Sequence, residues 1–270
     1  MKTKVSLLIA CLLVTLTGFA RTTETVSGNG NVITKRISIS DYNEISTVGV
    51  VEFVYEQSNA APYLEVQIDE NLLPLLQMQV DGKELKVGPK KVKENSRNGN
   101  TYNLRPTTFK VISNSRELKE LNVVSSGDFI IASPIHVEKL EINMAGSGNI
   151  LLKKKAEGNK IEINLASSGS VVASDINLNT IECSLAGSGA IQIAGKASRA
   201  EYNLAASGNI KAFDCITEKT ECNIAGSGNI QTYTKNQLEA NIVGSGNVYY
   251  KGNPTTSKSI IGSGKLKDAN

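Results

Sequence analysis

The chain has 270 residues, of which 29 are basic and 26 acidic, with no tryptophan and one histidine. This length suits one large domain or two small ones, with room for a sizeable core. A net charge of only +3 provides no global field to attract nucleic acid, so we expect no nucleic-acid partner. The high content of Ile, Val, Asn, Gly and Ser indicates extended strands joined by tight turns.

The first 20 residues have the pattern of a secretory signal peptide. A basic start precedes an apolar run from Val5 to Leu16, and Gly18-Phe19-Ala20 supplies the small residues of a cleavage site. We therefore expect cleavage after Ala20 and an extracytoplasmic protein, in the periplasm or at the cell surface. Leu8-Ile9-Ala10-Cys11 also matches a bacterial lipobox, so a lipoprotein beginning at Cys11 is the minor alternative. No other segment has the roughly 18 apolar residues that a membrane helix needs.

A repeat of about 20 residues occupies residues 116–270. Each copy contains a Ser-Gly turn, and the glycine of that pair serves as its anchor. The anchors, 18 to 21 residues apart, are Gly127, Gly148, Gly169, Gly189, Gly208, Gly228, Gly246 and Gly264. Such a period is typical of solenoid architectures, in which each copy forms one turn of the fold.

Four positions recur at fixed distances from the anchor. With few exceptions, Glu lies seven residues before it, Asn five before it, and apolar residues four before it and two after it. This pattern has the two-residue period of a strand with one buried face, so Glu and Asn point outward. A single unit cannot bury its inner face, whereas stacked units share a continuous core. We predict an all-β fold, a parallel β-helix or β-solenoid of about 20-residue rungs, and leave open whether it has two or three sides.

Residues 21–115 are less regular. We predict a mostly-β N-terminal segment that is continuous with the solenoid and covers its first rung. Strand-like runs occupy residues 50–55, 63–68, 84–87 and 109–112, and residues 69–76 have the capping pattern of one short helix. Residues 90–103 are polar and basic, which indicates an exposed loop. At the other end, Lys258, Lys265 and Lys267 mark the last repeat as a charged terminal cap.

The cysteines test this alignment. Cys183 and Cys222 occupy the same repeat position, with Tyr202 between them, so they lie two rungs apart, or about 9–10 Å. A disulfide requires Cα atoms within about 7 Å, so we expect no bond between them. Both are predicted to be small core residues, and Cys215, in a later strand of its rung, is not expected to meet either.

No catalytic or metal-binding pattern is present. The Gly-Ser-Gly turns lack a G-x-G-x-x-G fingerprint, and His136 is the only histidine, which argues against a Ser-His-Asp site. Calcium-binding β-rolls carry Asp in their turns, but only Asp128 follows an anchor here. We expect no cofactor, no metal and no catalytic residue.

Two sets of residues are candidates for binding. The first is the outward Asn column, whose amides can form a ladder and also face solvent: Asn143, Asn164, Asn203, Asn223 and Asn241. The second is an aromatic patch after the late turns, composed of Tyr233, Tyr249 and Tyr250. The Glu column beside the Asn column alternates with basic residues, which predicts a neutral, soluble outer sheet.

The order of motifs resembles one bacterial family. A Gly-Asn-Gly-Asn opening at residues 28–31 and an Asp-Glu-Asn-Leu-Leu-Pro segment at 69–74 precede the repeated Gly-Ser-Gly-Asn-Ile turns. This arrangement resembles the family of unknown function described as putative autotransporter adhesin, head GIN domain, over roughly residues 28–265. The resemblance implies a β-helical extracytoplasmic protein with an adhesive or cell-surface role, and it implies no catalytic residue.

Three functional hypotheses remain. The first is a non-enzymatic surface or periplasmic protein that binds a glycan or a cell-surface protein through its repetitive polar face. The second is a polysaccharide-active β-helix enzyme, which would need Asp, Arg, Lys or His clustered on one rung face. The third is a structural component of the envelope. The sequence leaves homo-oligomerisation open.

Overall fold

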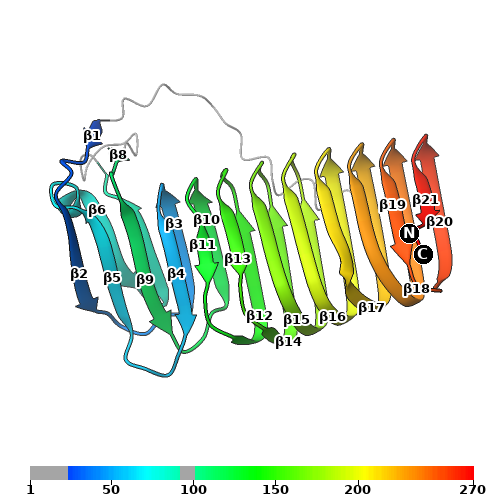
Figure 1. Cartoon of the computed structure of the whole chain (residues 1–270), viewed down its shortest axis with the longest axis horizontal. Coiled ribbons are helices and arrows are strands. Elements are labelled where there is room, and N and C mark those ends of the chain that lie inside the picture. Colours follow the sequence, from blue (N-terminus) through cyan, green and yellow to red (C-terminus); the bar gives the residue numbers. More distant parts are fainter. Residues whose placement is uncertain (1–23, 92–100) are drawn as a thin grey trace.

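The computed structural model describes residues 24–91 and 101–270, which form an elongated solenoid of strands stacked along one axis (Figure 1). The predicted signal peptide, Cys11 and most of the predicted loop at 90–103 lie outside the described residues. The elements are β1 (Thr25–Ser27), β2 (Val32–Ser38), β3 (Glu44–Gly49), β4 (Glu52–Gln57), β5 (Tyr63–Asp69), the 3-10 turn η1 (Leu73–Leu75), β6 (Leu76–Asp81), β7 (Glu84–Pro89), β8 (Asn103–Arg105), β9 (Phe109–Ser115), β10 (Glu120–Ser125), β11 (Phe129–Ile131), β12 (Ile135–Met144), β13 (Asn149–Leu152), β14 (Ala156–Leu165), β15 (Ser170–Leu185), β16 (Ala190–Ala206), β17 (Asn209–Gly226), β18 (Asn229–Gly244), β19 (Asn247–Lys251), β20 (Thr255–Gly262) and β21 (Lys265–Asp268). No helix in this part of the chain is long and apolar enough to cross a membrane.

Successive rungs pair in parallel and in the register that the repeat predicts. Glu141 of β12 lies opposite Glu162 of β14, and Asn143 lies opposite Asn164. In a regular rung the paired residues fall in three stretches, for example 149–152, 156–158 and 160–165. The predicted all-β solenoid with rungs of about 20 residues is therefore confirmed, with three short stretches of strand in each turn.

The buried face of each strand contributes to one continuous hydrophobic core along the solenoid. Side-chain volumes compensate one another along its columns. Tyr202, fully buried, lies opposite Cys183 in the preceding rung and Cys222 in the following one. The small thiols leave the space that the phenol ring fills, as dense packing requires. Cys183, Cys215 and Cys222 are all buried and free, in agreement with the predicted absence of a Cys183–Cys222 bond.

The turn glycines are required because adjacent rungs touch there through their backbones. A Cβ atom on Gly148 would collide with the carbonyl oxygen of Gly127 in the rung before it. Any side chain would therefore force the rungs apart, and small residues recur for this reason. Ala206 is the one non-glycine residue with positive φ among the described residues, at 142°, and its counterparts in the next rungs are Gly226 and Gly244.

The N-terminal third contains a rung that the repeat alignment did not predict. β3 pairs in parallel with β10, which places Glu44 opposite Glu120, and β4 pairs in parallel with β11. β7 and β9 add the next rung outward by pairing with β3 and β4. The antiparallel strands β2, β5 and β6 then cover this end, since β5 joins β9, β2 joins β5 and β6 joins β7 (Figure 1).

The predicted helix at residues 69–76 is wrong, because only the 3-10 turn η1 forms there. Asp69 does not cap a helix. Its side chain is fully buried at the end of β5 and accepts hydrogen bonds from the N–H groups of Gly30 and Thr107, both 2.8 Å, and from the Thr107 hydroxyl, 2.9 Å. Nearby, Asn71 accepts from the N–H of Asn29 and donates to the carbonyl of Ser27. The Gly-Asn-Gly-Asn opening and the Asp-Glu-Asn segment thus form one structural unit.

The last rung, β20 and β21, pairs only with β18 and β19, so within the described chain its outer edge has no strand partner. Ile260 and Leu266 remain partly buried against the core. Lys258, Lys265 and Lys267 lie on this rung and are exposed. Lysines on an exposed edge disfavour pairing with another chain, which is the protection expected of a charged terminal repeat.

Candidate functional site

We call the solvent-facing side of the Glu-Asn strands, from β10 to β18, the polar outer face. Three columns run along it: a basic column, the Glu column and the Asn column. The register places Glu162, Glu182, Glu201, Glu221 and Glu239 opposite one another in successive rungs. Because the strands are only about 4.8 Å apart, side chains of neighbouring rungs contact one another along each column.

The Asn column forms hydrogen-bonded ladders. Asn143 Nδ2 donates to Asn122 Oδ1 at 3.1 Å, and Asn164 Nδ2 donates to Asn143 Oδ1 at 3.0 Å. A second ladder links Asn241, Asn223 and Asn203 with bonds of 3.0 and 2.9 Å. Within a rung, the Asn amide also donates to Oε1 of the Glu two residues earlier, as Asn223 does to Glu221 at 3.1 Å. The amides therefore fix the positions of the carboxylates beside them.

The polar outer face is divided in one rung, where Ser184 replaces Asn and Thr180 replaces the basic residue. Before this rung the charges neutralise one another. Lys160 Nζ lies 2.7 Å from Glu182 Oε2 and 3.5 Å from Glu162 Oε2, and Lys139 pairs in the same way with Glu141 and Glu162. The pKa of Lys160 is raised, because its hydrogen bond and charge interaction with Glu182 outweigh the opposing effect of its partial burial.

Beyond Ser184 the same face holds a shallow hollow of about 160 Å³. Its lining residues are Arg199, Ala200, Glu201, Lys219, Thr220, Glu221, Gln237 and Glu239. Among the ion pairs of the described residues, none involves Arg199 or Lys219. The hollow thus presents carboxylate acceptors and cationic donors that are not neutralised by direct contacts, on a scaffold that the Asn ladder holds in place.

The structure separates the three candidate tyrosines. Lys251 lies opposite Tyr233 in the neighbouring strand. Tyr249 is two residues before Lys251, so its side chain points the same way. Tyr233 and Tyr249 therefore share the outer side of the sheet. Tyr250 alternates with Tyr249 and packs against the hydrophobic core. Lys267 Nζ lies 4.9 Å from the centre of the Tyr249 ring. The outer side therefore carries two tyrosines, of which Tyr249 has a neighbouring cation.

The buried thiols lie around Tyr202. Burial raises the pKa of Cys215 to about 12, and it also raises the pKa of Cys183, with Cys215 contributing as a neighbour. Cys215 contributes to the raised pKa of both Cys183 and Tyr202, so it lies near them, and the expectation that it would not meet Cys183 is wrong. The Tyr202 hydroxyl has no hydrogen-bond partner among the described residues, and burial raises its pKa.

The repeat pattern predicts the columns but not the hollow. The residues that break the repeat pattern indicate where the hollow lies. Thr180 and Gln237 interrupt the basic column, and Ser184 interrupts the Asn column. The charged side chains between these positions are the ones left unpaired. Within residues 24–91 and 101–270, no cluster of three or more His, Cys, Asp or Glu side chains could hold a metal ion.

Comparison with known proteins agrees with this architecture. A crystal structure of a putative lipid binding protein from Parabacteroides distasonis is 53% identical, with a TM-score of 0.89, and the match covers 92% of this chain and 100% of that one. A putative adhesin from Parabacteroides merdae is 35% identical, with a TM-score of 0.84 and coverage of 92% and 100%. A second putative adhesin, from Parabacteroides distasonis, is 30% identical, with a TM-score of 0.84 and coverage of 91% and 100%.

No curated protein matches the chain. The family described as "Putative auto-transporter adhesin, head GIN domain" matches residues 41–157 and 149–254, which together make up most of the chain. The family resemblance of the motifs is thereby confirmed, and the chain belongs to this adhesin family.

Proposed function

We propose that this chain is an exported, non-enzymatic binding protein of the adhesin type, which binds a glycan or a cell-surface protein through its polar outer face. The observation that carries the proposal is the hollow lined by Arg199, Glu201, Lys219, Glu221 and Glu239, where the charges that pair elsewhere on this face are left free. Family membership and the names of the solved relatives support an adhesive role.

The geometry suits recognition of a hydroxyl-rich or polar ligand. In the rungs of Glu201, Glu221 and Glu239, the neighbouring Asn donates to Oε1, which leaves the other carboxylate oxygen to accept from a ligand. Arg199 and Lys219 supply donors beside them. We include Asn143, Asn164, Asn203, Asn223 and Asn241 as residues that position this face, and Tyr233 and Tyr249 as an aromatic surface for a sugar ring.

A glycan and protein array probed with the purified chain tests the proposal. The double variant Arg199→Ala/Lys219→Ala should weaken binding to the retained ligand about tenfold or more, as expected for the loss of central interface contacts. Lys139→Ala, on the same face but ion-paired with Glu141 and Glu162, is the matched control and should bind like the wild type. Absence of any ligand across broad panels, or equal binding by the double variant, would contradict it.

The competing hypotheses predict different results. A polysaccharide-active enzyme would release reducing or unsaturated sugar ends from polyuronides, and we expect no such release. A single stoichiometric envelope partner on chemical cross-linking in cells would favour a structural component of the envelope.

A second candidate function is lipid binding, and a separate surface favours it. The outward residues of five adjacent strands form an aliphatic stripe in which each residue is opposite the next: Ile112, Val54, Ile130, Leu151 and Val172. Each is half-buried and lies between two inward-facing residues of its strand. Over four rung steps the stripe is about 19 Å long.

This aliphatic stripe ends in polar residues. The next two positions of the column are Gln192 and then Lys211, which is exposed. An apolar track that leads to a cation suits the acyl chain of an anionic amphiphile, and the 53% identical relative carries the name of a lipid binding protein. Fluorescence of a polyene fatty acid should rise on binding to the wild type and not to Leu151→Asp, while Gln231→Asp should behave like the wild type. Equal fluorescence with Leu151→Asp would rule out the stripe.

A further inference from the structure

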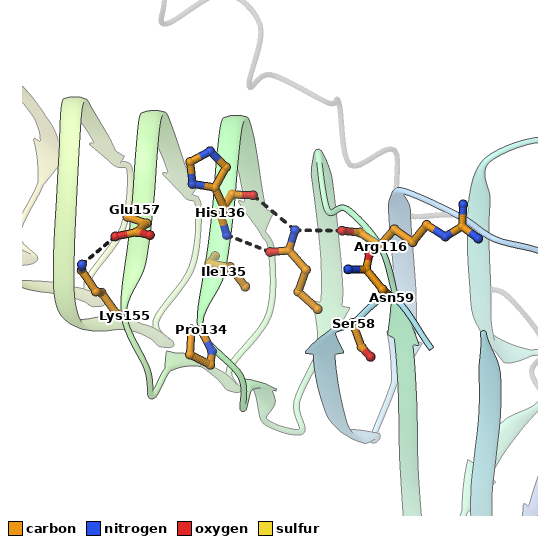
Figure 2. A pocket seen from close by; sticks show the side chains of 9 residues that line it. Ser58, Asn59, Arg116, Pro134, Ile135, His136, Lys155 and Glu157 are labelled. Carbon is orange, nitrogen blue, oxygen red and sulfur yellow. Dashed lines mark hydrogen bonds and ion pairs between the residues drawn. The ribbon is translucent and has the colours of Figure 1, made fainter. Parts of the chain in front are cut away.

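A second hollow, of about 330 Å³, lies where the N-terminal strands meet the solenoid. It is lined by Gln57, Ser58, Asn59, Arg116, Pro134, Ile135, His136, Lys155 and Glu157. Figure 2 shows Lys155 and Glu157 on one side of it, Arg116 and Asn59 on the other, and His136 and Pro134 between them. Hollows of this size with convergent polar groups are the usual place for small-ligand sites.

The hollow has a rigid base, provided by Gln57. Its Oε1 accepts from the N–H of His136 at 2.8 Å, and its Nε2 donates to the carbonyls of Arg116 at 2.8 Å and His136 at 3.3 Å. Its own N–H donates to Ser133 Oγ at 2.7 Å. One amide side chain therefore ties three separate segments together, which fixes the backbones that carry Arg116 and His136.

The functional groups around this base are of mixed kind. Arg116 is exposed and only loosely held by Asp41, with 3.9 Å between Nε and Oδ2, so most of its guanidinium donors face solvent. Lys155 pairs closely with Glu157, with 2.6 Å between Nζ and Oε2. Ser58 and Asn59 add neutral polar groups, and the exposed ring of Pro134 adds an apolar surface.

The geometry points to this hollow as a binding site for an acidic saccharide, a sugar that carries a carboxylate. The guanidinium of Arg116, at the rim of the hollow on the side opposite Lys155, matches a carboxylate in a bidentate manner. Sugar hydroxyls find donors and acceptors on Ser58, Asn59 and the Lys155–Glu157 pair, and the C–H face of the sugar packs on Pro134. This site is separate from the polar outer face and does not depend on the function proposed there.

His136 makes the test specific, because it is the only histidine in the chain. The ring C–H signal of His136 in a histidine-labelled sample reports on the hollow alone. We expect a saturable shift on titration with galacturonate and none with galactose, which has a neutral hydroxymethyl group in place of the carboxylate. Arg116→Gln should abolish the galacturonate shift, and Arg199→Gln, in the other hollow, should leave it unchanged.

Three outcomes would overturn the proposal. These are an equal shift with galactose, a galacturonate shift that survives Arg116→Gln, and an equal shift with inorganic phosphate, which would mark a general anion site instead. Arg116 is exposed and its carbonyl, not its side chain, bonds to Gln57, so the variant should fold. Lys155→Gln provides a second variant, in which the shift should be weakened.

Discussion

The backbone N–H of Gly30 donates a hydrogen bond of 2.8 Å to Oδ1 of Asp69, and this bond joins the Gly-Asn-Gly-Asn opening to the end of β5. Gly28 lies so close that a Cβ atom there would collide with the Asp69 carboxylate. The glycines of the opening and Asp69 of the 69–74 segment are therefore explained by this close contact, which joins two of the motifs that carry the family resemblance at the N-terminal end.

The first prediction concerns Asp69. Burial favours a higher pKa, but the hydrogen bonds from Thr107 and Gly30 together hold the pKa of Asp69 below its usual value. Its contribution to stability is thus present above the unfolded-state pKa of about 3.9 and is lost as pH falls through the lower folded-state value. Asp69→Asn should lower the urea midpoint at pH 7 and lose this acid dependence. Glu70→Gln, at the exposed neighbouring contact, should change the midpoint little.

The second prediction concerns backbone strain at Ala206. Its φ of 142° lies in a region that favours glycine, and the next rungs have Gly226 and Gly244 at this position. Strain of this kind costs about 1–3 kcal/mol, whereas a glycine loses up to about 1 kcal/mol more entropy on folding. Ala206→Gly should therefore raise the free energy of unfolding by about 1 kcal/mol, as measured by urea denaturation. Ala205→Gly, at the adjacent strand position, should lower it instead.

The third prediction tests the close approach of the turns. Gly148→Ala should destabilise the solenoid by about 1–3 kcal/mol, because the new methyl group meets the Gly127 carbonyl and the rungs must separate. The neighbouring Ser147 is exposed, so Ser147→Ala is a matched control and should stay within about 0.5 kcal/mol of the wild type. An equally mild effect of both substitutions would mean that the turns are not tightly stacked.

The fourth prediction concerns the thiols around Tyr202. Because burial raises the pKa of Cys215 to about 12, and also raises that of Cys183 and Cys222, all three should stay protonated in the folded state. In a chain without residues 1–20, a thiol-specific disulfide reagent should react with none at pH 8 and with three after unfolding in guanidinium.

The same thiols predict a pH dependence. A folded-state pKa above the unfolded value of about 8.5 gives stability that is fully present below pH 8.5 and is lost as pH rises above it. Between about pH 8.5 and 10, the free energy of unfolding should therefore fall more steeply in the wild type than in the triple Cys→Ala variant. Identical slopes would show that the thiols titrate normally in the folded state.

The parts of the fold that could be predicted from the sequence are those encoded by the periodic repeat. The Glu, Asn and aliphatic columns recur in nearly every rung, so strand direction, register and the two-rung separation of Cys183 and Cys222 could be predicted. The rung formed by β3 and β4 was not recognised, because its turn reads Val48-Gly49-Val50 and lacks the Ser-Gly pair. A capping pattern at Asp69 predicted a helix, but the tertiary contact with Gly30 used that carboxylate instead.

The candidate sites were less predictable for a physical reason. The hollow at Arg199 and Lys219 follows from breaks in columns, which are visible only after the rungs are stacked. The hollow at His136 assembles from residues near 57, 116, 134 and 155, which no local pattern connects. Tyr250 was grouped with Tyr233 and Tyr249 by sequence proximity, but strand alternation turns it toward the core.

Export is the claim on which the whole proposed function depends. The most direct measurement is protease treatment of intact cells that produce the chain, combined with N-terminal sequencing of the mature protein. We predict a mature chain that begins at Arg21, or at Cys11 in the lipoprotein alternative. A surface protein should be degraded in intact cells, and a periplasmic one only after the outer membrane is permeabilised. A chain that retains Met1 and stays protected until the cytoplasm is opened would contradict it.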